Sequence, residues 1–166
     1  MRPAAIVRAM AGSAKHDGKP ARRVVSVNKK ARHEFDVLDT YEAGLVLRGT
    51  EVKSLRAGRI SLEEAWAKIE DGEAFLIGAH VDEYEHGNRE NHQPARRRKL
   101  LLHRRQIKKL RSQATLRGLT LIPLDVYFNE KGIAKVTIAV CRGKKLHDKR
   151  EAEKARSARR EMRDLI

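Results

Sequence analysis

The sequence predicts a mainly β protein: an antiparallel barrel with two or three helices, followed by a basic C-terminal tail. Three observations support this. Short runs of β-branched and aromatic residues are separated by turn residues, two pairs of these runs are spaced as hairpins, and residues 143–166 contain few side chains that could be buried. A chain of 166 residues has room for one domain with tails. We therefore expect a flexible extension over residues 1–22, a barrel over 23–142 and the tail after it.

Seven apolar runs supply the expected strands and their approaches. They are residues 24–28, 34–38, 44–48, 65–69, 74–78, 119–128 and 132–140. Asp71-Gly72 has the composition of a tight hairpin turn, and residues 129–132 form a second one. The last run alternates, so one face is expected in the core and the other in water. The residues on the expected wet face are Lys135, Thr137 and Ala139. Because closure removes sheet edges, an oligonucleotide-binding-type barrel is the expected architecture.

Two helices are expected between the strands. Thr50 is a good N-cap for a short helix over residues 51–57. Apolar residues at helical spacing, surrounded by Lys and Arg, predict a second helix over residues 104–117. Between them, residues 80–98 are polar and contain Gly and Pro, which predicts a long exposed loop that ends in the basic cluster 96–99.

The charge distribution indicates a polyanionic partner. The chain carries 37 Lys and Arg against 22 Asp and Glu, a net charge of +15. Residues 91–124 contain ten of these bases and no acid. Such an uneven distribution of charge favours a nucleic acid as the partner, although a uniformly solvated basic surface is the alternative. With only seven aromatic residues, recognition is expected to depend on RNA shape, phosphates and 2′-hydroxyls more than on rows of stacked bases.

Several classes of function find no support in the sequence. The single cysteine, Cys141, excludes an internal disulfide and fits a reducing compartment, so we expect a cytoplasmic protein. No apolar run is long enough to span a membrane. His80, His86 and His92 recur six residues apart, which places them on no common helix face, and we expect no metal. No nucleophile motif, phosphate loop or dinucleotide fingerprint occurs, so neither catalysis nor a cofactor is expected.

Three basic segments are candidate binding sites, each with a structural alternative. Residues 28–34 combine the point charge of Lys with the planar fork of Arg, which suits a bent phosphate backbone, but a solvated strand edge would look the same. The helix over residues 51–57 offers an N-terminus for a phosphate, or simply packs against the barrel. The helix over residues 104–117 could face RNA or serve solubility alone.

Six sequence blocks, in order, resemble the SsrA-binding protein (SmpB) family. The blocks are residues 28–35, 41–45, 49–58, 71–76, 98–102 and 143–150. The resemblance implies an oligonucleotide-binding-type barrel that binds the tRNA-like domain of transfer-messenger RNA. It also implies delivery of that RNA to the decoding region of ribosomes stalled on messages that lack a usable codon. The implied protein is an adaptor for trans-translation that acts as a monomer when bound, without a membrane partner.

The resemblance also assigns residues. The positions that match its RNA-binding surface are Asn28, Lys29, Arg32, His33, Glu42, Lys99, Leu101 and Lys135. The tail, disordered until bound, is implied to become helical in the empty message channel of the ribosome. Its matching positions are Lys144, Lys145, His147, Asp148, Lys149 and Arg150. Two departures are visible: His103 stands where the family pattern has Asn, and the distal tail lacks a Trp found in some relatives.

Two other functions are compatible with the residues alone. A ribosomal or ribosome-associated β-barrel would bind ribosomal RNA without preferring a tRNA-like fold, and competition with bulk tRNA and ribosomal RNA fragments would distinguish it. An RNA nuclease would cleave structured RNA in the presence of magnesium or zinc.

Overall fold

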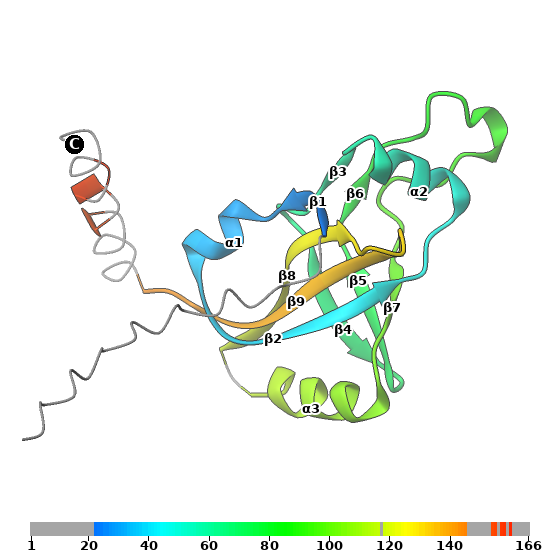
Figure 1. Ribbon diagram of the computed structural model, residues 1–166. Coiled ribbons are helices and arrows are strands. Elements are labelled where there is room, and N and C mark those ends of the chain that lie inside the picture. Colours follow the sequence, from blue (N-terminus) through cyan, green and yellow to red (C-terminus); the bar gives the residue numbers. More distant parts are fainter. Residues whose placement is uncertain (1–21, 117, 146–153, 156, 159, 161–166) are drawn as a thin grey trace, which may run out of the picture.

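An antiparallel barrel forms the body of the molecule (Figure 1). The computed structural model describes residues 22–116, 118–145, 154–155, 157–158 and 160. Its seven-stranded sheet has the order β1-β8-β4-β5-β7-β2-β9, and pairing of β8 with β9 closes it. The strands are β1 (Arg23–Val27), β2 (Phe35–Leu45), β4 (Trp66–Glu70), β5 (Glu73–Ile77), β7 (Arg98–Leu101), β8 (Leu119–Phe128) and β9 (Ala134–Gly143). This confirms the predicted oligonucleotide-binding-type, mainly β architecture.

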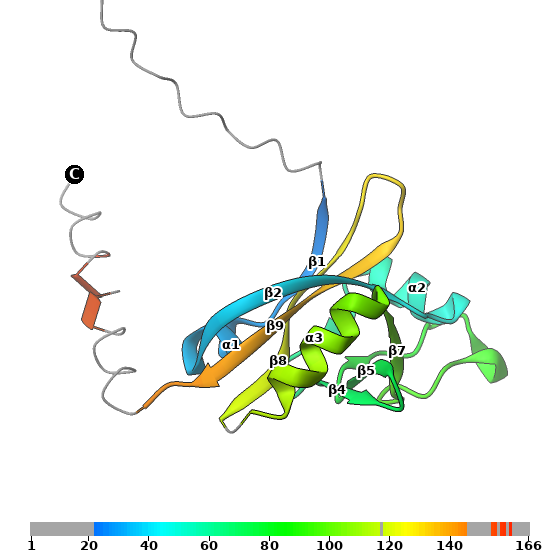
Figure 2. The ribbon, with the colours of Figure 1, turned by 90° about the horizontal axis from the view of Figure 1, so that it is seen from below.

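Among the described residues up to position 145, three α-helices are formed. They lie on the outside of the barrel at separate places (Figures 1 and 2). They are α1 (Lys29–Glu34), α2 (Gly49–Arg56) and α3 (Arg104–Ala114). A small two-stranded sheet joins β3 (Ile60–Ser61) to β6 (His80–Val81), and a single 3-10 turn, η1, spans Asn88–Glu90. The first helix was missed by the sequence analysis because six residues are too few to show a helical period.

Both predicted hairpins are confirmed. β4 pairs with β5 across Asp71-Gly72, whose φ angles of 49° and 75° are the left-handed pair that a two-residue turn requires. β8 pairs with β9 along almost its full length. The prediction of separate strands over 34–38 and 44–48 was wrong, because β2 runs continuously between them. The intervening polar residues pair with β9, and a bulge between Val37 and Asp39 lets the strand bend around the barrel.

The predicted start of α2 was wrong as well. Arg48, and not Thr50, is the N-cap. The Glu51 carboxylate accepts a hydrogen bond from the Arg48 backbone N–H at 2.6 Å, which satisfies one free donor of the first turn. Thr50 is unavailable because its hydroxyl lies 3.0 Å from Nδ1 of the buried His92. α3 ends at Ala114, three residues before the predicted end at position 117.

The loop over residues 80–98 was predicted to be exposed, but parts of it are buried. His92 and Arg98 are each only 1% exposed. The Nε of Arg98 donates to Glu51 at 2.9 Å, and Arg96 donates to the same carboxylate at 2.8 Å. Two members of the predicted basic cluster, Arg96 and Arg98, therefore attach the loop to α2 and are not available to a partner in solvent.

Two groups of apolar side chains form the core. The larger one fills the barrel. The smaller one lies beneath α1 and consists of Ala31, Ile122, Leu124, Ala139 and Cys141, with Phe35 at its edge. The predicted wet face of β9 is consequently correct for Lys135 and Thr137, which are half-buried, but wrong for Ala139, which α1 covers completely.

Candidate nucleic-acid interface

A wide groove brings together four of the predicted RNA-binding residues: Glu42, Lys99, Leu101 and Lys135. It has a volume of about 1010 Å³ and is bounded by α3, β7, the β4–β5 turn and the adjoining parts of β2 and β9. Five Lys or Arg residues and three Asp or Glu residues line it. Its size and excess of basic side chains suit a nucleic-acid backbone better than a small ligand.

Strand register explains why residues so far apart in sequence meet in the groove. Gly44 of β2 pairs with Leu101 of β7 on one side and with Lys135 of β9 on the other. A Cβ at Gly44 would come within 3.3 Å of the Leu101 Cβ, so the absent side chain lets these neighbours stand close together. Leu101 is 54% exposed in a position where an apolar surface can contact a base or a ribose.

Glu42 is held in place by two partners. It accepts a hydrogen bond from the Tyr127 hydroxyl, and its carboxylate lies 3.4 Å from Lys135 Nζ. The Tyr127 hydrogen bond lowers the pKa of Glu42 despite partial burial, and Lys135 lowers it further. Burial and the nearby carboxylate raise the pKa of Tyr127 to about 12. Glu42 is thus ionised at neutral pH and orients Lys135 at the groove wall.

Tyr127 was not recognised from the sequence as a residue of this site. It is 4% exposed, and the Arg22 guanidinium lies 4.9 Å from its ring centroid. Its position within the apolar run of β8 gave it the appearance of an ordinary core residue. The contact becomes visible only when β9 pairs with β2 as well as with β8, because this brings Glu42 close to Tyr127.

Two further polar contacts lie at the groove. Lys99 forms an ion pair with Glu73 on the neighbouring strand. His103 is the N-cap of α3, and its backbone N–H donates to Gln106 Oε1 at 3.0 Å. His103, which replaces the Asn of the family pattern, therefore lies at the start of a basic helix and lines the groove.

The four predicted residues around α1 lie outside the groove. Asn28 is buried: its amide donates to the Leu62 carbonyl at 2.8 Å, and its side-chain oxygen caps α1 by accepting from Ala31 at 2.9 Å. Lys29 and Arg32 are exposed on the helix, and His33 is half-buried. Arg32 lies 3.9 Å from the buried carboxylate of Asp125. Asn28 thus positions a helix whose basic residues face solvent.

The predicted tail begins as part of the barrel. The backbone N–H of Lys144 donates to Glu34 O at 2.9 Å, and its ammonium lies 3.6 Å from Asp36. Lys145 is exposed. The other predicted tail positions, His147, Asp148, Lys149 and Arg150, lie outside the described residues. The tail therefore leaves the barrel beside α1.

The three spaced histidines are engaged separately. His92 is buried between Thr50 and Val81, His80 lies 3.4 Å from Asp82, and His86 contacts the ring of Tyr84. Across the described part of the chain, no group of three or more His, Cys, Asp or Glu side chains is arranged to hold a metal ion. Among those same residues, no helix has the length and apolarity needed to span a membrane.

Comparison with known proteins identifies the family. The family model described as "SmpB protein" matches residues 25–166. The chain belongs to the SmpB family. It is 54% identical over 144 residues to the SsrA-binding protein of Rhizobium etli (strain CIAT 652), covering 87% of this chain and 91% of the relative. It is 51% identical over 152 residues to the SsrA-binding protein of Brucella canis, covering 92% and 96%.

A solved SmpB structure matches in three dimensions. It is described as "tmRNA-SmpB: a journey to the center of the bacterial ribosome", and the match has a TM-score of 0.63 with 48% sequence identity. It covers 73% of this chain and 85% of the other. The SmpB family match includes the groove, α1 and the C-terminal segment together.

Proposed function

We propose that this protein is the RNA-binding adaptor of trans-translation, which binds the tRNA-like domain of transfer-messenger RNA and delivers it to stalled ribosomes. The observation that carries the proposal is the groove in which Leu101, Gly44 and Lys135 lie in a row beside basic α3. It occurs in a chain about half identical to proteins named for SsrA binding. The adaptor acts in the cytoplasm as a monomer when bound, without a catalytic step, a metal or a cofactor.

The groove is suited to folded RNA. Lys135, Lys108 and Arg104 can neutralise phosphates, while Leu101 offers an apolar contact between them. Glu42 acts chiefly by orienting Lys135, since both of its oxygens already have partners. Shape and backbone contacts of this kind suit a tRNA-like fold, whose bases are mostly paired.

A second contact surface is formed by α1. Lys29, Arg32 and His33 would touch RNA directly, and Asn28 would act by holding the helix on the barrel. Because α1 also anchors Lys144, the chain leaves the barrel next to this surface. We assign the residues after Lys145 to a tail that contacts the ribosome in the empty message channel, and the barrel to residues 23–145.

A competition gel shift tests RNA binding. The protein is titrated against the tRNA-like domain of transfer-messenger RNA at near-physiological salt with excess bulk tRNA. Binding should persist, and Lys135→Gln should weaken it. Lys131→Gln is the matched control, because Lys131 is an exposed lysine on the β8–β9 turn that does not line the groove. If bulk tRNA removes all binding, the protein is a general basic RNA binder instead.

Truncation after Lys145 tests the division of roles. The cut preserves the Lys144 contacts with Glu34 and Asp36, which a cut at residue 143 would destroy. The truncated protein should bind the tRNA-like domain with near-normal affinity yet fail to support tagging on stalled ribosomes. Equal loss of binding and tagging would contradict the assignment of signalling to the tail.

A further inference from the structure

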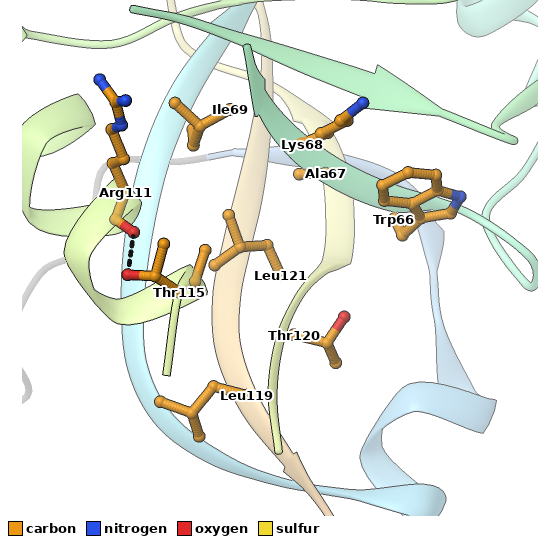
Figure 3. Close-up of a pocket in the computed structure, with 10 residues that line it drawn as sticks. Trp66, Ala67, Lys68, Ile69, Arg111, Thr115, Leu119, Thr120 and Leu121 are labelled. Carbon is orange, nitrogen blue, oxygen red and sulfur yellow. Dashed lines mark hydrogen bonds between the residues drawn. The ribbon is translucent and has the colours of Figure 1, made fainter. Parts of the chain in front are cut away.

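A second hollow lies where the C-terminal end of α3 meets β4 and β8 (Figure 3). Its volume is about 310 Å³, the lower end of the range for pockets that hold small ligands. Trp66 and Arg111 stand at opposite ends, with Ala67 and Leu121 between them (Figure 3). Trp66 is the only tryptophan of the chain and is 42% exposed. An aromatic plane is therefore open to solvent within a defined recess.

The charge of this hollow favours a phosphate-bearing occupant. Its ten lining residues include Lys68 and Arg111 but no Asp or Glu. Lys68 is already matched by Glu70 at 3.0 Å. Arg111, within the described residues, forms no ion pair, so its guanidinium supplies the available positive charge. A ring system that carries phosphate would find a stacking surface at one end and a cation at the other.

The two hollows on either side of Trp66 differ in charge. On its other side lies a hollow of about 250 Å³ that contains Glu34, Glu63 and Glu64 against a single lysine, Lys30. Phosphates would be repelled there. The sign of the lining charge thus changes at Trp66, and of these two hollows the one next to α3 is the one suited to a phosphate.

The hollow also shares a lining residue with the RNA groove. Arg111 lines both, so α3 contributes one cation to two adjacent recesses. An RNA strand bound in the groove would meet the hollow where it passes Arg111. This shared residue favours the RNA in the groove as the occupant.

We propose that the hollow binds one unpaired nucleotide of the same transfer-messenger RNA, with the base against the Trp66 indole and a phosphate near Arg111. The inference rests on the proposed function and extends the contact surface beyond the groove. Stacking on an aromatic side chain tolerates any base, so the site would add affinity without reading sequence.

Tryptophan fluorescence tests the proposal directly, because Trp66 is the only source of the signal. The tRNA-like domain is added to the full chain while binding is followed independently by gel shift. Stacking should quench the emission in step with binding. If RNA binds by gel shift but the emission is unchanged, the second site is wrong and the proposed function stands. If no RNA binds, both fail.

Substitutions separate stacking from bulk hydrophobic contact. Trp66→Leu should weaken affinity about tenfold, whereas Trp66→Phe should retain most of it. Tyr84→Leu is the control, since it removes a half-buried aromatic ring that lines neither the hollow nor the groove. Arg111→Gln should reduce the quench. Equal affinity of the Leu and Phe variants, or quenching by ribosomes but not by the tRNA-like domain, would overturn the proposal.

Discussion

Replacing Glu51 by Gln should destabilise the protein more than any exposed charge substitution. Glu51 is fully buried and accepts hydrogen bonds from Arg98, from Arg96 and from the Arg48 backbone. Burial opposes its ionisation, but these donors and the two guanidinium charges together lower the pKa of Glu51. Glutamine has nearly the same volume, but it carries no negative charge to balance Arg96 and Arg98. Its amide NH2 group would also point at N–H donors that now bond to a carboxylate oxygen.

The magnitude follows from the state of Arg98 after the substitution. Arg98 would keep the carbonyls of Ala79 at 2.6 Å and Pro94 at 2.9 Å, but its charge would be buried without a partner. Breaking a buried pair in this way costs about 3–5 kcal/mol. That is a large share of the roughly 6–18 kcal/mol available to a barrel of about 120 residues. The melting temperature should fall by roughly 12–20 °C.

Urea unfolding and thermal melting, followed by circular dichroism, measure this effect. Glu85→Gln is the matched control, because Glu85 pairs with Arg59 at the surface and is 63% exposed at its side chain. The control should leave the unfolding midpoint unchanged. Similar midpoints for the two variants would refute the argument that the ion pairs of Glu51 with Arg96 and Arg98 fasten the loop over residues 80–98 to α2.

Three further predictions concern α1, the groove and the acid stability of the barrel. Asn28→Ala removes both the α1 cap and the bond to Leu62, so urea unfolding should show a loss of about 1–3 kcal/mol. Lys135→Gln should lower the slope of log affinity against log salt by roughly 0.7–0.9 in salt titrations; an unchanged slope would mean that Lys135 meets no phosphate. The Lys109 hydrogen bond lowers the pKa of Asp39 to about 2, so its contribution is present above pH 4 and is lost as pH falls toward 2. Asp39→Asn should therefore flatten the melting temperature across that window, and an unaltered pH dependence would argue against the contact.

The fold was predictable where local chemistry is decisive. Asp71-Gly72 specified its hairpin, and the alternation after Ala134 specified the inward face of β9. Prediction failed where a distant partner competes with a local signal. Thr50 has the chemistry of an N-cap, but its hydroxyl forms a hydrogen bond with His92, 42 residues away in sequence. The same is true of Arg98, which belongs to a basic run in sequence and to a buried ion pair in space.

The candidate site divides in the same way. The sequence by itself indicated the partner class, because ten bases without an acid over residues 91–124 favour a polyanion, and it indicated the family through six ordered blocks. Only the tertiary structure decided which residues act together. Pairing of β2 with β7 and β9 places Leu101, Gly44 and Lys135 in one row and brings Tyr127 against Glu42, while α1 stands apart. Strand register is set by contacts between distant segments, and composition carries no record of it.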